Sequence, residues 1–231
     1  MLIGSGLLAH AFSRAFLRRE DVCIYAAGVS NSSCTDIHEF AHERQRLGDA
    51  LRQAMHVDVF VYFGTCSVAD PEVRHTAYVQ HKLAMEQMVS AHSRNLILRL
   101  PQVAGKTPNP HTLLNFLYGR IARSESFNLW SKAKRNIIDV ADVVAIAQQL
   151  IANTSMRNTT LNIANTVNYS MPEIVRAMEF VVCKSAVYDA MERGSEYYID
   201  TSAIYPLLDK VGIESGNNYL EKTISKYYVS K

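Results

Sequence analysis

Short apolar runs alternate with amphipathic segments along the first 165 of the 231 residues. The runs have the length and composition of buried strands: MLIG (1–4), DVCIYAAG (21–28), VDVFVYFGT (57–65), NLILRLP (95–101) and TTLNIAN (159–165). Segments 5–20, 36–55 and 78–92 carry apolar residues at helical spacing, and the second is expected to begin at Thr35 or Asp36. Strands that alternate with helices pair in parallel through right-handed crossovers. The sequence therefore predicts an α/β fold with a doubly wound parallel sheet.

The remaining segments predict a smaller lobe beside this sheet. Residues 105–139, which contain the only tryptophan, interrupt the alternation, and residues 166–231 have the pattern of helices plus one short strand, EYYID (196–200). We expect a sheet domain at 1–165, with 105–139 contributing to the lobe, and a small C-terminal substrate-binding lobe at 166–231. Ligands usually bind where such a lobe meets the carboxyl ends of parallel strands.

Composition argues against several classes of partner. The 24 basic and 22 acidic residues are spread along the chain, so we expect neither nucleic acid nor a membrane surface as a partner. Four cysteines without C-x-x-C spacing predict neither a zinc site nor a disulfide framework, and they favour a cytoplasmic setting. No histidine spacing indicates a metal site, and His75 and His81 are expected on the surface.

A glycine-rich turn follows the first apolar run. Gly4-Ser5-Gly6-Leu7-Leu8-Ala9 matches the G-x-G-x-x-G/A pattern after a strand and at the start of a helix. Gly4 would permit the tight turn, Gly6 would let the backbone approach a pyrophosphate, and Ala9 would let the helix pack closely on the strand. The helix N-terminus would offer amides to phosphate. The pattern indicates a dinucleotide site, although a strand–helix turn that needs glycines for its own geometry has the same pattern.

A possible catalytic group follows the third apolar run. Thr65 ends that run, where a hydroxyl would face the ligand cleft, and Tyr78 and Lys82 stand one helical turn apart. Thr65 would bind a substrate oxygen, Tyr78 would transfer a proton, and Lys82 would lower the pKa of the phenol from about 10 toward neutrality. Alternatively, Thr65 caps the strand end, and Tyr78 and Lys82 lie on a solvated helix face.

The order of these segments resembles the extended short-chain dehydrogenases/reductases, the NAD-dependent epimerase/dehydratase group that modifies nucleotide sugars. The resemblance rests on the glycine turn, YAAG (25–28), Thr65, Tyr-x-x-x-Lys, LRLPQVAG (98–105) and RNIIDVADVV (135–144), and it extends through SMPEIVRAME (170–179). It implies a Rossmann-like sheet and a catalytic triad of Thr65, Tyr78 and Lys82. It also implies that Lys82 holds the nicotinamide ribose.

The resemblance also implies the ligand contacts. A cofactor, NAD or NADP, would be held by Gly4, Ser5, Gly6, Leu7, Leu8, Ala26, Ala27, Gly28, Tyr78, Lys82, Pro101, Gln102 and Val103. A nucleotide-sugar substrate would be contacted by Ser67, Asn115, Trp130 and Arg135, although Trp130 is equally suited to anchoring the small lobe. Cys66 beside Thr65 is expected to be a small buried thiol.

The chain departs from this family in its dinucleotide-binding half. The family has two further strand–helix units before the strand that YAAG resembles, so segment 21–28 corresponds either to the fourth strand of a sheet of reduced strand number or to the second strand. If it is the second strand, no acidic residue stands at its end to bind a ribose hydroxyl. Arg18 and Arg19 would suit the 2′-phosphate of NADP, or they would simply complement the dipole of the helix that they end.

Together these observations predict an NAD(P)-dependent oxidoreductase or epimerase that acts on a nucleotide sugar, with Tyr78 as acid and base. Dehydratases of the family follow the strand-end Thr with Asp-Glu, where this chain has Cys66-Ser67, so 4,6-dehydration is the least favoured reaction. The alternative is a catalytically degenerate protein that keeps the fold as a binding or structural module. The helices at 36–55 and 78–92 suggest a homodimer through a four-helix interface.

Overall fold

The computed structural model describes residues 1–16, 19–213 and 217–229. Its main sheet has five parallel strands in the order β1-β2-β3-β4-β8. They are β1 (Leu2–Ile3), β2 (Val22–Tyr25), β3 (Val59–Thr65), β4 (Asn95–Leu100) and β8 (Thr159–Asn162). The prediction of a Rossmann-like α/β fold with a parallel sheet of reduced strand number is confirmed.

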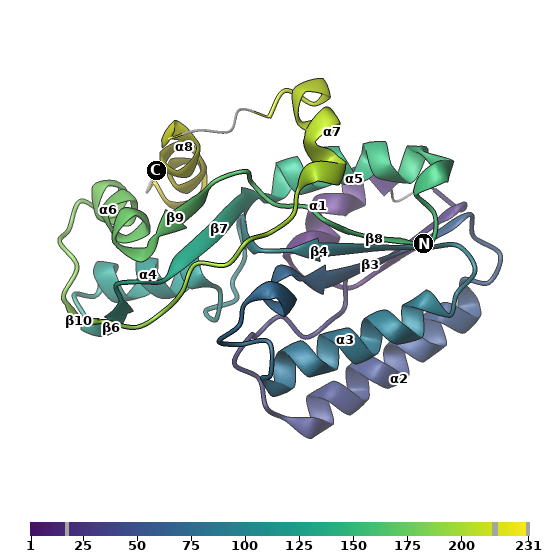
Figure 1. Ribbon diagram of the computed structural model, residues 1–231, viewed down its shortest axis with the longest axis horizontal. Coiled ribbons are helices and arrows are strands. Elements are labelled where there is room, and N and C mark those ends of the chain that lie inside the picture. Colours follow the sequence, from purple (N-terminus) through teal and green to yellow (C-terminus); the bar gives the residue numbers. More distant parts are fainter. Residues whose placement is uncertain (17–18, 214–216, 230–231) are drawn as a thin grey trace.

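Alternate residues of these strands face two helical layers. One layer contains α1 (Leu7–Phe16) and α5 (Val140–Ala152), which pack on Ile24, Val61 and Leu98. The other contains α2 (Ile37–Gln53) and α3 (Ala77–Ser90), which pack on Tyr25, Tyr62 and Ile97. Figure 1 shows the first layer above the sheet and the second below it. Asp36 caps α2 by accepting a hydrogen bond from the His38 amide at 2.8 Å, as the sequence predicts.

The connections between the first strands do not all have the predicted right hand. The chain moves in one direction across the sheet from β1 to β2 to β3, but α1 covers one face and α2 covers the other. Two parallel connections that move the same way over opposite faces must have opposite hands. One of these two connections is therefore left-handed, whereas about 98% of such crossovers are right-handed.

The strand order also decides which strand of the usual sheet β2 represents. In the usual order 3-2-1-4-5-6, the second strand lies on the far side of the first strand, and the fourth lies between the first and the fifth. Here β2 lies between β1 and β3, and β1 is the edge strand. Segment 21–28 therefore takes the place of the fourth strand, and the alternative that it is the second strand is wrong.

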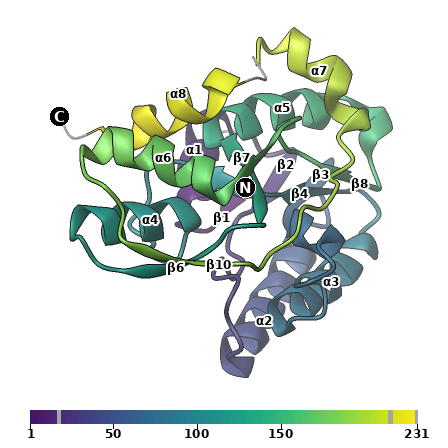
Figure 2. The ribbon, with the colours of Figure 1, turned by 60° about the vertical axis from the view of Figure 1, so that its left-hand side comes forward.

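A second group of elements has its own apolar core. It contains a three-stranded sheet, a two-stranded sheet and three helices: β5 (Gln102–Ala104), β7 (Lys134–Asp139) and β9 (Asn168–Ser170); β6 (Phe127–Trp130) and β10 (Tyr188–Met191); and α4 (Leu113–Ala122), α6 (Met171–Val182) and α8 (Asn217–Tyr228). In Figures 1 and 2 these elements lie to one side of the main sheet. Short 3₁₀ turns stand at Cys66–Ala69, Thr154–Met156 and Ser202–Ile204. The division into domains at residue 165 stays a prediction.

The C-terminal third crosses between the two cores. Residues 196–200 were expected to form a strand, and this is wrong, because their backbone has no neighbouring strand. Side-chain amides hold the segment instead, with Asn168 donating to the Tyr197 carbonyl at 3.1 Å and Asn162 donating to the Asp200 carbonyl at 2.9 Å. The chain then forms α7 (Tyr205–Lys210), whose Leu208 packs in the core beside α5. None of the described helices is long and apolar enough to cross a membrane.

Candidate active site

The glycine turn between β1 and α1 has the geometry that its sequence predicts. Gly4 has φ of +130°, and a Cβ there would overlap the carbonyl of Ala26, so the position requires glycine. A Cβ on Gly6 would instead meet no atom of the described structure within 4 Å. The first hydrogen bond of α1 runs from the His10 amide to the Gly6 carbonyl at 3.0 Å, so the amides before His10 lie in the open first turn. The turn thus has free space on its ligand side and amides suited to an anion.

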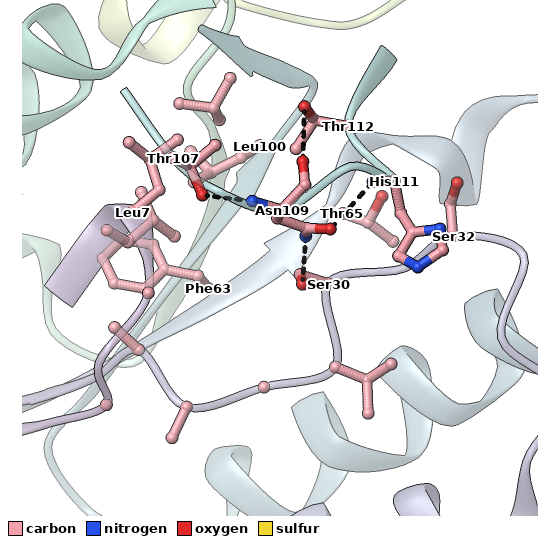
Figure 3. Close-up of a pocket in the computed structure, with 18 of the residues that line it drawn as sticks. Leu7, Ser30, Ser32, Phe63, Thr65, Leu100, Thr107, Asn109, His111 and Thr112 are labelled. Carbon is pink, nitrogen blue, oxygen red and sulfur yellow. Dashed lines mark hydrogen bonds between the residues drawn. The ribbon is translucent and has the colours of Figure 1, made fainter. Parts of the chain in front are cut away.

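The carboxyl ends of the main strands and the segment 100–112 enclose a cavity of about 630 Å³. Figure 3 shows this cavity with side chains from β3, α1 and the segment after β5 around it. Every sequence-predicted catalytic and cofactor residue lines it, together with Ser67: Gly4, Ser5, Gly6, Leu7, Leu8, Ala26, Ala27, Gly28, Thr65, Tyr78, Lys82, Pro101, Gln102 and Val103. Residues as distant in the sequence as Gly4 and Val103 therefore converge on one site.

Thr65 stands at the end of β3 and Tyr78 near the start of α3. The Thr65 hydroxyl accepts a hydrogen bond from the Ser67 amide at 3.1 Å, so it also caps the turn that follows, as the alternative interpretation held. Tyr78 and Lys82 are 9% and 4% exposed. Their alternative placement on a solvated helix face is therefore wrong.

The pKa of Tyr78 is not lowered toward neutrality, as the sequence predicts, but raised. Burial and the negative charge of Glu43 together raise the pKa of Tyr78 to about 12, although a hydrogen bond with Thr65 acts to lower it. The predicted depression toward neutrality by Lys82 is therefore not found. At neutral pH the phenol is therefore protonated.

Lys82 is paired with a residue that the sequence analysis missed. Its Nζ lies 3.4 Å from Oε1 of Glu43 on α2 and 4.8 Å from the centre of the Tyr62 ring. Burial lowers the pKa of Lys82, while Glu43 raises it. Gly28 leaves room for the pair, since a Cβ there would lie 2.7 Å from the Lys82 Nζ and 2.8 Å from Glu43 Oε1.

Glu43 is 2% exposed and has four partners. Its carboxylate accepts from the Val29 amide at 2.7 Å and the Tyr62 hydroxyl at 3.1 Å, and it contacts His81 Nε2 at 2.9 Å. His81 is therefore buried, and its expected surface position is wrong. Burial raises the pKa of Glu43, but Lys82, the Val29 amide and His81 together bring it below its usual value. The sequence signal was an acidic residue on the apolar stripe of α2, in line with Leu47 and Ala50.

The cavity contains three cationic side chains, from Arg46, Lys82 and Lys106, and no aspartate or glutamate among its described lining residues. Across its rim the Asn109 amide donates to the Ser30 hydroxyl at 3.1 Å, which joins the segment after β2 to the segment after β5 (Figure 3). A cavity with this charge and these polar groups suits an anionic ligand. Sequence reasoning missed Arg46, Lys106 and Asn109 because no motif contains them.

The predicted substrate residues are less closely grouped. Ser67 lines the cavity, whereas Asn115, Trp130 and Arg135 lie outside it. The Asn115 side chain donates to the carbonyls of residues 107 and 109 at 2.8 and 2.7 Å, so it supports the cavity wall. Trp130 on β6 is 37% exposed, and Arg135 on β7 donates to the Lys134 carbonyl at 2.8 Å.

The remaining expectations concern Arg18, Arg19 and Cys66. Arg19 binds Asp21 through both carboxylate oxygens and does not line the cavity, while Arg18 lies outside the described residues. Cys66 is buried as predicted, and burial raises the pKa of its thiol to about 12, so it is a poor nucleophile.

Comparisons with known proteins identify the family and the fold. Residues 7–164 match the model of the NAD dependent epimerase/dehydratase family. No curated protein sequence matches the chain. Among solved structures, UDP-glucuronic acid 4-epimerase from Bacillus cereus, in complex with UDP-glucuronic acid and NAD, has a TM-score of 0.72 at 15% identity and covers 93% of this chain and 76% of its own.

A second structure, RMD from Pseudomonas aeruginosa complexed with NADPH, has a TM-score of 0.69 at 15% identity and covers 96% of this chain and 85% of its own. At such identities the structural likeness concerns the fold. The family model spans more than half of the chain, from α1 to the end of β8. The chain therefore belongs to the NAD dependent epimerase/dehydratase family.

Proposed function

We propose that this protein is an NAD(P)-dependent oxidoreductase or epimerase that acts on a nucleotide sugar. The observation that carries the proposal is the convergence of the glycine turn with Thr65, Tyr78 and Lys82 on one cationic cavity. The similar structures support it, since they are complexes with UDP-glucuronic acid and NAD in one case and with NADPH in the other.

The chain's residues fit a dinucleotide at this site. The free space beside Gly6 and the open amides of the turn suit a pyrophosphate, and Pro101, Gln102 and Val103 line the same cavity as Tyr78 and Lys82. When bound, NAD(P) supplies the acceptor or donor of a hydride.

Tyr78 would move the proton that accompanies this redox change. As a buried phenol it would donate its proton to a keto oxygen of the sugar, and as a phenolate it would take the proton of a hydroxyl. Thr65, which hydrogen-bonds to Tyr78, would hold the same sugar oxygen. Proton acceptance requires Lys82 to face Tyr78 more than Glu43, because only a nearby cation would lower the pKa of the phenol.

A nucleotide sugar brings two phosphates, which explains a cavity lined by cations. Lys106 and Arg46 line it at the segment after β5 and on α2. Their positive charge would attract the diphosphate without fixing the sugar. Simple reduction or epimerisation at C4 needs only the three catalytic residues and the hydride carrier.

The test is a panel of UDP-hexoses incubated with the protein and NAD⁺, with nuclear magnetic resonance detection of the 4-epimer. A UDP-4-ketohexose with NADPH is assayed in parallel by loss of the reduced-nicotinamide absorbance. We expect turnover in one arm and none from Tyr78→Phe. Turnover that Tyr78→Phe retains would contradict the assignment of Tyr78.

The second candidate is a catalytically degenerate binding or structural module. Two observations favour it: the pairing of Lys82 with Glu43, and the position of β1 at the sheet edge. It predicts a folded protein that carries no nucleotide and gives no turnover in either arm.

We also propose a homodimer through α2 and α3. The two helices lie side by side in Figures 1 and 2, and Ile37, the first residue of α2, and Met55, just after its end, are exposed. Antiparallel packing of this pair on a second copy would cover both side chains in a four-helix interface.

A further inference from the structure

The sheet ends where a dinucleotide usually places its adenosine. In the usual order 3-2-1-4-5-6, the second and third strands extend the sheet beyond the first, and an acidic residue about 20 residues after the glycine turn binds the adenosine ribose. Here β1 is the edge strand, and β2 already occupies the place of the fourth strand. The described chain has no strand end on that side of the glycine turn.

The opposite hands of the β1–α1–β2 and β2–α2–β3 connections also follow from the absence of these two strands. In the usual order the helix after the first strand leads outward to the second strand, so it lies on the face opposite the helices that follow the fourth and fifth. In this chain α1 keeps that face, but it leads inward to β2, which follows after only residues 17–21. Compared with the usual order, the described sheet lacks the second and third strands and the helices that follow them.

The cavity reflects this loss. Its catalytic residues and the glycine turn remain together, as does the 101–103 segment. Among its described lining residues no carboxylate is present to bind a ribose 2′-hydroxyl, and Arg19, which stands nearest to the missing units in sequence, is bound to Asp21. A site that hydrogen-bonds a ligand hydroxyl discriminates strongly against a ligand that lacks this hydroxyl. A chain without such a site cannot discriminate between the two ligands in this way.

We infer that this protein recognises its cofactor through the nicotinamide, the attached ribose and the phosphates, and leaves the adenosine in solvent. NADH, NADPH and reduced nicotinamide mononucleotide would therefore bind with similar affinity. The inference rests on the proposed function, because it concerns the same cavity.

The test is a set of fluorescence titrations of the full chain with NADH, NADPH and reduced nicotinamide mononucleotide. We expect dissociation constants for NADH and NADPH within about threefold, and a constant for the mononucleotide within about tenfold of both. AMP should not displace bound NADH. Gly6→Val should weaken all three ligands, because Gly6 lines the cavity and even a Cβ there would occupy space that no described protein atom fills within 4 Å.

The outcomes separate this inference from the proposed function. Binding of NADH about a hundredfold tighter than the mononucleotide, or displacement of NADH by AMP, would overturn the inference and leave the proposed function intact. A preference for NADPH that Arg46→Gln removes would also overturn it, because Arg46 would then hold an adenosine 2′-phosphate. Failure of all three ligands to bind would overturn the proposed function, and the inference with it.

Discussion

Lys82→Met should unfold the protein more easily because it leaves Glu43 buried and without its cation. Removing one partner of a buried ion pair typically costs about 3–5 kcal/mol. Glu43 keeps its three other partners, Val29, Tyr62 and His81, and the Lys82 contact at 3.4 Å is the longest of the four, so we expect the low end, about 3 kcal/mol at pH 7.

Protonation of Glu43 sets an upper limit on this cost. If the variant takes up a proton at Glu43, the cost is about 1.4 kcal/mol for each pH unit above an unfolded pKa of about 4.3, hence roughly 4 kcal/mol at pH 7 and about 1 kcal/mol at pH 5. The sign follows from the pKa shifts. In the native protein the lowered pKa of Glu43 gives stability above that unfolded pKa, and this stability is lost as pH falls through the folded value. In the variant burial raises the pKa, so the deficit grows with pH.

The assay is urea unfolding followed by circular dichroism at pH 7 and pH 5. The matched control is the double variant Lys82→Met/Glu43→Gln, which removes both charges and should recover stability to within about 1 kcal/mol of the native protein at pH 7. A Lys82→Met variant as stable as the native protein at pH 7, or a deficit independent of pH, would refute the reasoning. Activity measured in the double variant reports the catalytic role of Lys82 without the folding defect.

Four other outcomes are expected. Gly4→Ala should destabilise the fold by more than 1 kcal/mol in urea unfolding, because its φ is positive and its Cβ overlaps Ala26, while Gly6→Ala should not change stability measurably. Tyr78→Phe should lower kcat by about 10²–10⁴ in the assay that shows turnover, with unfolding free energy nearly unchanged. Asn115→Ala should cost about 1–3 kcal/mol of stability, because it leaves two carbonyls of the cavity wall unpaired. Light scattering at two concentrations should give twice the chain mass, and a monomer at both would exclude the dimer through α2 and α3.

The sequence patterns correctly predicted the strands and turns that depend mainly on residues close together in the sequence. Three of the apolar runs form β2, β3 and β4. The glycine turn and Thr65 lie at strand ends, as predicted, because neighbouring residues largely determine where a strand ends and a turn begins. Since the carboxyl ends of parallel strands meet at one edge of the sheet, placing the strands was enough to bring the predicted cofactor residues together.

The missed features depend on contacts between distant segments. Glu43 is 39 residues from Lys82 in sequence, and nothing in the pattern of α2 states which cation its carboxylate meets. The Asn109–Ser30 bond spans 79 residues and has the same difficulty. The hand of the first connections depends on which strands are absent, and residues 196–200 have strand-forming side chains but no neighbour to pair with.

The most direct test of the proposed active site is a calorimetric titration of nucleotide-free protein with NAD⁺, made on the native chain and on Gly6→Val. The proposed function predicts that the native protein binds NAD⁺ and that Gly6→Val loses that binding, because Gly6 lines the cavity and a Cβ there meets no described protein atom within 4 Å. Absence of heat from the native protein, or equal affinity in the two proteins, would contradict the assignment of the cavity as a dinucleotide site.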